Sequence, residues 1–408
     1  MYEKIFTLGA MYPSDFLEIN QQPRSQPVEL ELVFDNQTSL VRLKETTALT
    51  NMYGTYWYRS GINNSMKQEL QNIVKSIQEV LVLKDSDVWL DIACNDGTLL
   101  SFVPKNLVRI GIDPADNTYT EESRHHADLI IQDFFSYNCL QKSVYKNAQA
   151  KIISCIAMLY DLENPLEFLV DVVKVLHDDG LFVCQLSYSP LMIEQLAFDN
   201  ICHEHVYYYT LTTLQALFEQ AGLKILDCHL NHTNGGSFRI YAMKMQANTQ
   251  LFGTQPQRDV ASVRIASLIN WENQHGYNTK EKWQNFYNNI LKLKNSVVDF
   301  IYNQKKQGKT IWAYGASTKG NTLLQWFGLD YKVIDAVAER SPYKFGLKTV
   351  GTNIPIVSEQ QMRAAQPDYL LILPWHFIDY FQERECEYLK KGGKFIVPCP
   401  TFEIIGYE

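Results

Sequence analysis

The sequence predicts an α/β protein with a doubly wound sheet, a small β-rich N-terminal lobe and a second, Rossmann-like α/β domain near the C-terminus. Three observations predict this class. Between residues 87 and 250, short apolar strands alternate with amphipathic helices, a rhythm typical of a parallel sheet covered by helices. The same alternation returns after residue 308. The length of 408 residues exceeds what one hydrophobic core usually organises, so several domains are expected.

Residues 1–66 are expected to form the β-rich lobe. Three prolines break its first part into short extended pieces, and "VELELVFDNQTSLVRL" is typical of a hairpin that turns at Asp35-Asn36. The segment "MYGTYWYRSGINNSM" combines phenols with an arginine and asparagines, a set too polar for a core. It is expected to form a lid, and the apolar spacing of "KQELQNIVKSIQEVLVL" then predicts an amphipathic helix.

Residues 67–250 are expected to form the central domain. The predicted strands are "VWLDIA", "VRIGIDP", "ADLIIQDFF", "AKIISCIAMLYDL" and "LFVCQLSY", with a helix over "LEFLVDVVKVL" that ends at Asp179-Gly180. "LKILDCHLN" and "SFRIYAMKM" predict a closing antiparallel pair. Residues 251–308 are charged and helical, typical of a connector, and residues 309–408 form the second α/β domain.

Composition narrows the possible partners. The net charge of −8 offers no general attraction for nucleic acid or an anionic membrane. No apolar run approaches the roughly 20 residues of a membrane span, and the start lacks the pattern of a signal peptide, so a cytoplasmic protein is expected. The expected oligomeric state is a monomer or a homodimer. The eight cysteines contain no C-x-x-C pair, which favours buried apolar thiols over disulfides or a metal site.

The first candidate ligand site is the strand-turn-helix junction "LDIACNDGTLL". Its acid is followed 22 residues later by a second acid at the next strand end, a place that suits ribose hydroxyls. The turn has one glycine, so it departs from the G-x-G-x-x-G cradle for a pyrophosphate and resembles the looser turn of class I S-adenosylmethionine methyltransferases. A junction without a ligand is the alternative. The expected cofactor residues are Asp91, Ala93, Asn95, Gly97, Asp113, Asp133 and Phe134.

The second candidate site is "NICHEHVYYY". Its two histidines are two residues apart and cannot share one face of a helix, which disfavours the zinc geometry of H-E-x-x-H. Hydrogen-bonded loop histidines are one interpretation. The other is a general base, because the loop follows the fifth strand and returns over the carboxyl ends of the sheet.

The third candidate site is "YGASTKGNT" in the C-terminal domain, where Ser317, Lys319 and backbone amides could hold a diphosphate. A glycine-rich turn with a solvated lysine is the alternative. Glu339 at the next strand end, and Trp375-His376 after "LILP", are candidates for contacts to a ribose or base. The glycine-rich "NHTNGGSFRIY" could form a loop near the ligand or a plain hairpin turn.

Six motifs in order give the chain a resemblance that runs nearly end to end. They are "YWYRSGINNSM", "LDIACNDGTLL", "NICHEHVYYY", "NHTNGGSFRIY", "YGASTKGNTLLQWFG" and "LPWHF". The chain resembles the nucleotide-sugar C-methyltransferases, which use S-adenosylmethionine to methylate carbon 3 of an NDP-4-keto-deoxyhexose through an enolate. The resemblance implies that His205 is the base, with Glu204 orienting it, and that Tyr56 and Tyr58 approach the sugar. Further expected substrate contacts are Tyr53, Asn63, Tyr160, Asp161, His203, Asn234, Ser317, Lys319, Asn321, Glu339, Trp375 and His376.

The chain departs from that family at two places. Relatives usually carry zinc-binding cysteines in the N-terminal lobe, but no cysteine precedes Cys94, so no metal is expected and packing must hold the hairpin. Cys202 replaces a tyrosine, and "AMLYDLENP" stands where relatives have a histidine and an asparagine, so Tyr160 or Asp161 is expected to take part. The alternatives are a sugar O-methyltransferase, an NAD-dependent oxidoreductase and a nucleotide-sugar binding protein without catalysis.

Overall fold

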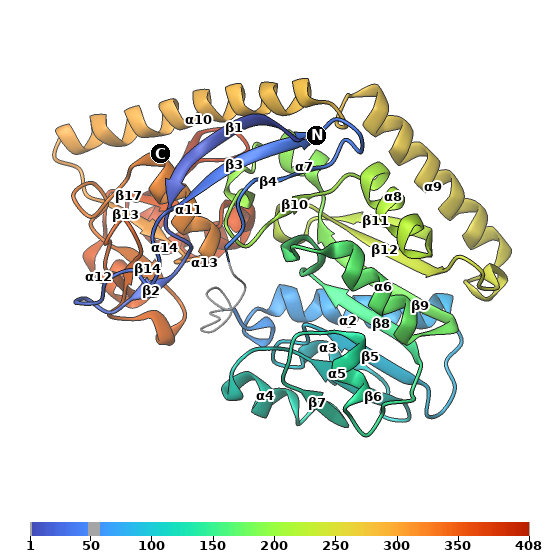
Figure 1. The fold of residues 1–408 in the computed structure, drawn as a ribbon. Helices are drawn as coiled ribbons and strands as arrows, with labels where there is room; N and C mark the ends of the chain where they lie inside the picture. The colour runs from blue at the N-terminus through green and yellow to red at the C-terminus, as the bar shows by residue number, and fades with distance from the viewer. Residues whose placement is uncertain (1, 48–57, 408) are drawn as a thin grey trace. The chain divides into compact units, whose positions relative to one another are not determined.

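The computed structural model describes residues 2–47 and 58–407 (Figure 1). The chain divides into two compact units. Unit 1 contains residues 1–47, 190–206 and 279–408, and unit 2 contains residues 48–189 and 207–278. Residues 1–47 of the predicted N-terminal lobe cluster in one unit with the predicted C-terminal α/β domain and with the loop that carries "NICHEH". The predicted bounds differ at two places: residues 58–66 of the lobe belong to unit 2, and the predicted connector 251–308 is divided between the two units after residue 278.

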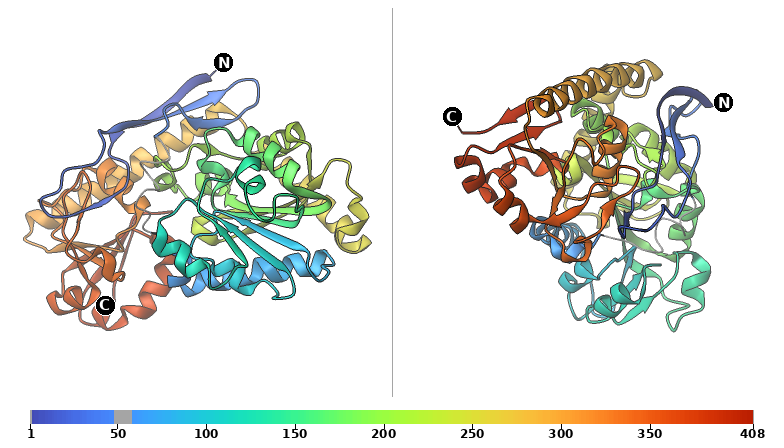
Figure 2. Two further views of the ribbon diagram at one scale, coloured as in Figure 1. Left: turned by 60° about the horizontal axis from the view of Figure 1, so that its bottom comes forward. Right: turned by 90° about the vertical axis from the view of Figure 1, so that its left-hand side faces the viewer.

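Unit 2 is built on a seven-stranded sheet with the order β11-β12-β9-β8-β5-β6-β7, and Figure 2 shows helices on both faces of this sheet. Strands β5 to β9 run parallel, and β11 and β12 close the sheet as the predicted antiparallel pair. The elements of this unit are η1 (Ser60–Ile62), α2 (Asn64–Val80), β5 (Val88–Ile92), α3 (Thr98–Phe102), β6 (Val108–Ile112), α4 (Asn117–Ser123), β7 (Leu129–Ile131), α5 (Tyr137–Gln141), β8 (Ala150–Ile156), η2 (Leu159–Asp161), α6 (Pro165–Val175), β9 (Leu176–Ser187), β10 (Tyr207–Tyr208), α8 (Leu211–Ala221), β11 (Leu223–Asn231), η4 (Thr233–Gly235), β12 (Ser237–Lys244), η5 (Thr249–Leu251) and α9 (Gln255–Gln274). The doubly wound class that the sequence predicts is confirmed, and its crevice lies beyond the carboxyl ends of the parallel strands.

Helix α2 packs its apolar side against one face of the sheet. Its apolar residues Leu70, Ile73, Val74 and Ile77 recur at helical spacing and pack in one core with Trp89 of β5. All five are at most 4% exposed, so the amphipathic pattern of the sequence becomes a buried stripe. The helix thereby fixes one wall of the crevice.

The boundary between α6 and β9 differs from the prediction. The helix was expected to extend to Asp179-Gly180, but it ends at Val175 and the strand begins at once. Leu176 already pairs with Ala150, and a register shift then lets the residues up to Gly180 bulge out before regular pairing resumes. Pairing of an apolar leucine with the buried neighbouring strand prevails over continuation of the helix.

Unit 1 contains the N-terminal lobe, the loop 190–206, a long helix and a six-stranded sheet of order β16-β14-β13-β17-β18-β19. Its elements are β1 (Tyr2–Met11), β2 (Phe16–Leu17), β3 (Val28–Asp35), β4 (Val41–Leu43), α7 (Ser189–Glu194), η3 (Phe198–Asn200), α10 (Lys280–Lys306), β13 (Ile311–Tyr314), α11 (Thr318–Phe327), β14 (Val337–Glu339), η6 (Pro342–Lys344), β15 (Lys348–Thr349), β16 (Ile356–Ser358), α12 (Glu359–Ala365), β17 (Tyr369–Ile372), η7 (Trp375–Phe377), α13 (Ile378–Arg384), α14 (Cys386–Lys390), β18 (Lys394–Val397) and β19 (Glu403–Ile405). The first five strands of this sheet are parallel and β19 is antiparallel.

The N-terminal lobe is an antiparallel arrangement of β1, β3 and β4, with the predicted hairpin turn after Asp35. Packing against α10 holds it: the ring of Phe6 in β1 stacks on Tyr287 at a centroid distance of 4.5 Å and also contacts Phe286. Among residues 2–47 and 58–407, no group of three His, Cys, Asp or Glu side chains could hold a metal ion.

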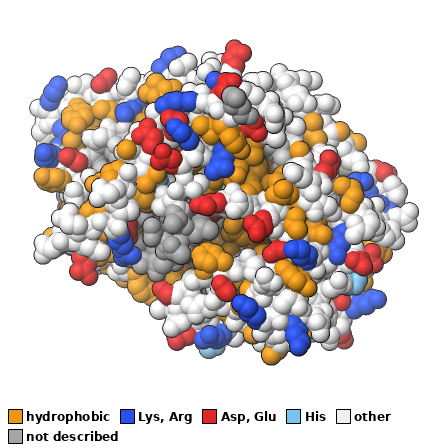
Figure 3. Space-filling view, in the orientation of Figure 1, with side chains coloured by type: hydrophobic (Ala, Val, Ile, Leu, Met, Phe, Trp, Pro, Cys, Tyr) orange, Lys and Arg blue, Asp and Glu red, His pale blue; other side chains and the backbone are white. Residues whose placement is uncertain are grey.

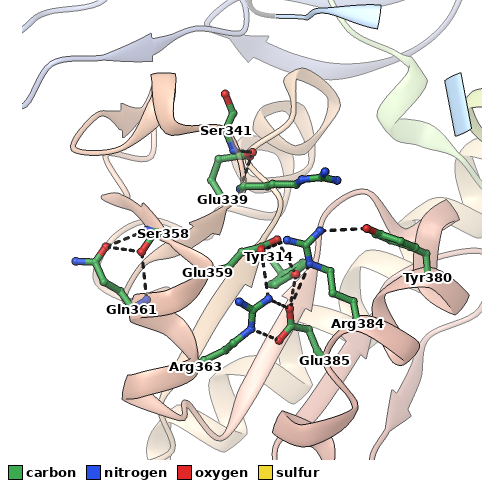
Figure 4. A network of polar contacts seen from close by, with 11 residues as sticks. Tyr314, Glu339, Ser341, Ser358, Glu359, Gln361, Arg363, Tyr380, Arg384 and Glu385 are labelled. Atoms are coloured by element: carbon green, nitrogen blue, oxygen red, sulfur yellow. Dashed lines mark hydrogen bonds and ion pairs between the residues drawn. The ribbon is translucent and has the colours of Figure 1, made fainter. Parts of the chain in front are cut away.

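A polar network around the buried Tyr314, Glu359 and Glu385 connects the C-terminal sheet to its helices (Figure 4). The hydroxyl oxygen of Tyr314, at the end of β13, lies 2.8 Å from carboxylate oxygens of both Glu359 and Glu385. Arg363 donates to both glutamates, and Arg384 donates to Glu359. Two negative and two positive side chains balance each other here, so the network ties α12 and α13 to the sheet at little electrostatic cost.

Charged side chains of both signs are interspersed over the face drawn in Figure 3, as expected from a net charge of −8 on 408 residues. Seven of the eight cysteines are buried, in keeping with their predicted role as small apolar side chains. No helix in the described part of the chain is both long enough and apolar enough to cross a membrane.

Candidate active site

Unit 2 contains a cavity of about 660 Å³ along the carboxyl edge of its sheet. The lining residues follow the strand order: Phe134 after β7, Asp113 after β6, Asp91 in β5, Ala157 after β8 and Gln185 in β9. The cavity thus extends along this edge from β7, β6 and β5, which carry the predicted cofactor motifs, to β8 and β9. Such a crevice is where ligands of doubly wound folds bind.

Three residues of the predicted cofactor turn have a left-handed backbone conformation. Ala93, Asn95 and Gly97 all have positive φ values, of 58°, 52° and 76°. A Cβ atom on Gly97 would lie 2.7 Å from the Cα atom of Ser123, so no larger residue fits there. The backbone N–H of Asn95 donates to a carboxylate oxygen of Asp113 at 2.7 Å, which fixes that acid at the mouth of the turn.

Asp113 and Asp91 are both buried in the cavity wall. Asp91 accepts a hydrogen bond of 2.6 Å from Ser154, whose hydroxyl accepts from the indole N–H of Trp89. Burial raises the pKa of Asp91 to about 7, opposed by the Ser154 hydrogen bond and reinforced by the charge of Asp113. Burial also raises the pKa of Asp113. A cation in the cavity would therefore be stabilised by two carboxylates that solvent hydrates poorly.

A short segment before α2 crosses this turn. The backbone N–H of Ser60 donates to the side-chain oxygen of Asn95 at 3.0 Å, and Tyr58 lines the cavity. Arg59 forms an ion pair of 2.6 Å with Glu122 on α4. The segment thereby connects the cofactor turn to the helix after β6. Tyr53 and Tyr56, predicted to lie in the lid, fall outside the described residues.

The structure brings together most, but not all, of the predicted residues of unit 2. Tyr160 and Asp161 line the cavity beside Ala157. Asp133 accepts from the backbone N–H of Phe134 and is absent from the lining, and Asn63 caps α2 by accepting from Ser65. Gly97 shapes the turn rather than the cavity wall. The side chain of Asn234 lies outside the description.

The "NICHEH" loop of unit 1 holds His205 in a defined tautomer. Its Nδ1 lies 2.8 Å from the backbone carbonyl oxygen of Asn200. Because a carbonyl can only accept, Nδ1 carries the proton and the lone pair is on Nε2. Burial, reinforced by the positive charge of Lys319, lowers the pKa of His205 to about 3, so the imidazole is neutral at physiological pH. The predicted orienting role of Glu204 stays a prediction.

Lys319, from the predicted diphosphate turn, contacts this loop. Its ammonium group donates to the side-chain oxygen of Asn200 at 2.6 Å. The same charge acts on Glu204, whose pKa burial nevertheless raises to about 7, and on His376, whose pKa burial and Lys319 together lower to about 3. The loop and the turn, predicted as two separate sites, therefore share one electrostatic environment.

Other predicted substrate residues of unit 1 have structural contacts. Ser317 caps α11, accepting from the backbone N–H of Gly320. His203 contacts the carbonyl of Val28 at 3.1 Å. The other three residues form hydrogen bonds within unit 1. Asn321 donates to Ser14 and to the backbone of Asp15, Trp375 donates to Asp199, and Glu339 accepts from the backbone N–H of Ser341.

Sequence reasoning missed several residues of these sites. Asn200 was quoted at the start of a motif but given no role, although it contacts both His205 and Lys319. Gln185 and Arg239 lie in segments predicted only as strands. The signal that was available is a polar residue at the carboxyl end of an otherwise apolar strand, "LFVCQLSY", because such a position faces the crevice.

Comparisons with known proteins agree with this geometry. Residues 62–227 match the family described as "Methyltransferase domain", and residues 232–400 match "C-methyltransferase C-terminal domain". Together they account for nearly all of residues 62–400. The chain is therefore a methyltransferase, and its C-terminal part is similar to that of C-methyltransferases. The chain is 27% identical over 383 residues to the C-methyltransferase NovU of Streptomyces niveus, covering 93% of this chain and 88% of NovU.

Solved structures give a weaker likeness. An S-adenosylmethionine-dependent methyltransferase from Clostridium acetobutylicum is 13% identical with a TM-score of 0.34, covering 45% of this chain and 93% of its own. Magnesium protoporphyrin IX methyltransferase from Synechocystis, with bound SAH, is 12% identical with a TM-score of 0.34, covering 47% and 90%.

The protein is an enzyme that uses S-adenosylmethionine, and its cavity fits this cofactor. Asp113 at the end of β6 and Phe134, which is 40% exposed, both line the cavity, and their contacts with the ribose and the adenine stay a prediction. Among the described residues Asp91 has Ser154 as its hydrogen-bond donor and no cationic partner, so a cationic cofactor would supply a charge that its buried carboxylate lacks.

Proposed function

We propose that this methyltransferase is a C-methyltransferase that acts on an NDP-4-keto-6-deoxyhexose and methylates the carbon next to the ketone, carbon 3, through an enolate. The observation that carries the proposal is the buried neutral imidazole of His205, whose Nδ1–H is committed to Asn200 and whose Nε2 carries the lone pair. Methylation of a carbon requires such a base, because a C–H bond beside a carbonyl is a weak acid.

The proposed first step is proton removal. Nε2 of His205 takes the proton from carbon 3, the electrons of the C–H bond form a double bond to carbon 4, and the carbonyl electrons move to the oxygen. Bound S-adenosylmethionine supplies an electrophilic methyl group that passes to carbon 3 while the electrons of the S–C bond stay on sulfur. Methyl transfer requires the base and the methyl donor to act on the same substrate molecule.

Lys319 gives the substrate's diphosphate a role in this step. Its positive charge is one of the two causes that hold the pKa of His205 near 3. An anionic diphosphate at Lys319 would offset that charge, so the pKa of His205 would rise when substrate binds and its basicity would increase. The substrate is thus expected to activate the base that acts on it.

Glu204 is the second group whose protonation suits the reaction. Its pKa is raised to about 7, so it can take up or release a proton near neutral pH. We assign it a supporting role beside His205, in which it accepts the proton that the imidazole must return to solvent. Tyr160 and Asp161, which line the cavity of unit 2, are proposed substrate contacts.

The experiment is product analysis with S-adenosylmethionine labelled with carbon-13 in its methyl group. Incubation with a dTDP- or GDP-4-keto-6-deoxyhexose should give a product whose labelled methyl couples to sugar carbons, with a carbon-13 shift typical of a C-methyl group. A methyl resonance typical of a methoxy group would instead establish a sugar O-methyltransferase. Binding without turnover of either sugar would contradict the proposed substrate class.

A further inference from the structure

The side chain of Gln185 has an unusual environment for a strand residue. It lies at the carboxyl end of β9, is 3% exposed and lines the cavity. Its cross-strand neighbour on β12 is Arg239, which is also buried. Buried amides normally satisfy both their oxygen and their nitrogen. Here only the oxygen is satisfied within the protein.

Two donors converge on the Oε1 atom of Gln185. Nε of Arg239 donates at 3.0 Å, and Nδ2 of Asn231 donates at 3.0 Å. The orientation of Asn231 is itself fixed, because its Oδ1 accepts from the backbone N–H of Thr233. No described residue accepts a hydrogen bond from Nε2 of Gln185. The amide is therefore locked with its NH₂ group as an unused donor in the wall of the cavity.

The electrostatics make this donor stronger than an ordinary amide. Arg239 is positively charged: its Nη2 atom forms an ion pair of 2.7 Å with Glu69, and its Nη1 atom donates to Ser76. A cationic donor on the amide oxygen polarises the amide and makes its N–H a better hydrogen-bond donor. Glu69 neutralises the net charge, so the environment is stable without a ligand.

The position of Gln185 on the sheet separates it from the predicted cofactor residues. Asp91, Asp113 and Phe134 are on or follow β5, β6 and β7, whereas Gln185 is on β9, beyond β8. Gln185 pairs with Ile156 of β8, one residue past the level at which Ile92 and Cys155 pair. The unused donor therefore lies on the side of the cavity away from the ribose and adenine residues.

We propose that Nε2 of Gln185 donates a hydrogen bond to the carbonyl oxygen of the acceptor and stabilises the negative charge that forms on it. This inference rests on the proposed enolate chemistry and names the electrophilic donor which that chemistry requires. Arg239 and Asn231 are positioning residues that act through Gln185. The geometry thus assigns the donor role to a polarised amide.

The test is the variant Gln185→Glu. A carboxylate keeps an oxygen for Arg239 and Asn231, so the fold is retained, but it replaces the donor with an acceptor. We expect kcat and the rate of solvent deuterium exchange beside the ketone to fall together by about 100-fold, as for loss of one oxyanion donor. The dissociation constant of S-adenosylhomocysteine should stay within about threefold of wild type, because the donor does not face the cofactor.

Controls separate this inference from the proposed function. Gln220→Glu makes the same change at an exposed position on α8 and should leave kcat unchanged. Asn231→Ala removes one of the two donors on Oε1 and should give an intermediate loss of kcat. Wild-type exchange with normal kcat in Gln185→Glu would overturn the inference alone, as would a loss of cofactor affinity equal to the loss of kcat. Absence of exchange in the wild type would overturn the proposed function, and the inference with it.

Discussion

Asp91→Asn should stabilise the ligand-free protein while weakening its hold on the cofactor. The wild-type carboxyl is 3% exposed, and burial raises its pKa to about 7 from an ordinary value of 3.8. Ionised Asp91 is therefore a cost to folding, and the proposed role of its charge is to bind the cationic cofactor. Asparagine has nearly the same shape and keeps an oxygen that can accept from Ser154, so the substitution removes the charge without opening a cavity.

The magnitude follows from the pKa difference. Because the folded-state pKa is raised, the unfolded chain loses this proton first as pH rises, and stability falls from about pH 3.8 until it levels off near pH 7. The difference corresponds to about 4 kcal/mol at roughly 1.4 kcal/mol for each factor of ten. Asp91→Asn should therefore raise the free energy of unfolding by up to about 4 kcal/mol at pH 8, and by less than about 2 kcal/mol at pH 5.

Urea denaturation of the ligand-free protein at both pH values measures this effect, and calorimetry measures the affinity for S-adenosylmethionine. That affinity should fall by roughly 10- to 100-fold at pH 8, the loss expected when a charged hydrogen-bond partner is removed. Asp299→Asn, the same change at an exposed position on α10, should alter neither quantity. A variant less stable than wild type at pH 8, or equally stabilised at both pH values, would refute the reasoning.

Three further predictions concern contacts outside the cavity wall. Asn200→Ala removes a hydrogen-bond partner of Lys319 and should lower kcat about tenfold in steady-state kinetics. The affinity for S-adenosylhomocysteine, measured by calorimetry, should not change. A kcat equal to that of the wild type would contradict a role of this contact in catalysis. Arg59→Ala breaks the ion pair with Glu122 and should raise the dissociation rate of S-adenosylhomocysteine about three- to tenfold in stopped flow, whereas an unchanged rate would exclude a retaining role. Glu272→Ala leaves four donors unmatched, those of Tyr188, Leu211 and two of Thr212, and should lower the free energy of unfolding by about 3–5 kcal/mol in urea. A much smaller loss would count against that network.

The sequence is sufficient to predict the fold class and the strand-turn-helix junction that lines the cavity, because both depend on local pattern. Alternation of strands and helices predicts the doubly wound sheet, and an acid at each of two successive strand ends predicts Asp91 and Asp113 in one crevice. The end of α6 was mispredicted because helical periodicity cannot show that Leu176 pairs with β8.

The rest of the candidate site depends on contacts that local pattern does not contain. Lys319 and Asn200 are 119 residues apart in sequence, and Gln185 and Arg239 are 54 residues apart. Which atom of Gln185 faces the cavity follows only from the donors on its oxygen. Likewise, Ser317 and Asn321 lie in a motif that suits a phosphate, but their side chains cap α11 and bind the N-terminal lobe.

The most direct measurement of the central claim, that a loop imidazole generates the nucleophilic carbon, is hydrogen exchange in D₂O. The enzyme is mixed with the 4-keto sugar nucleotide and S-adenosylhomocysteine, so that no methyl transfer can occur, and proton NMR follows the hydrogen beside the ketone. The wild type should exchange this hydrogen, and His205→Asn, which keeps a polar side chain without a basic nitrogen, should not. Exchange at the wild-type rate in His205→Asn would place the base elsewhere and contradict the account.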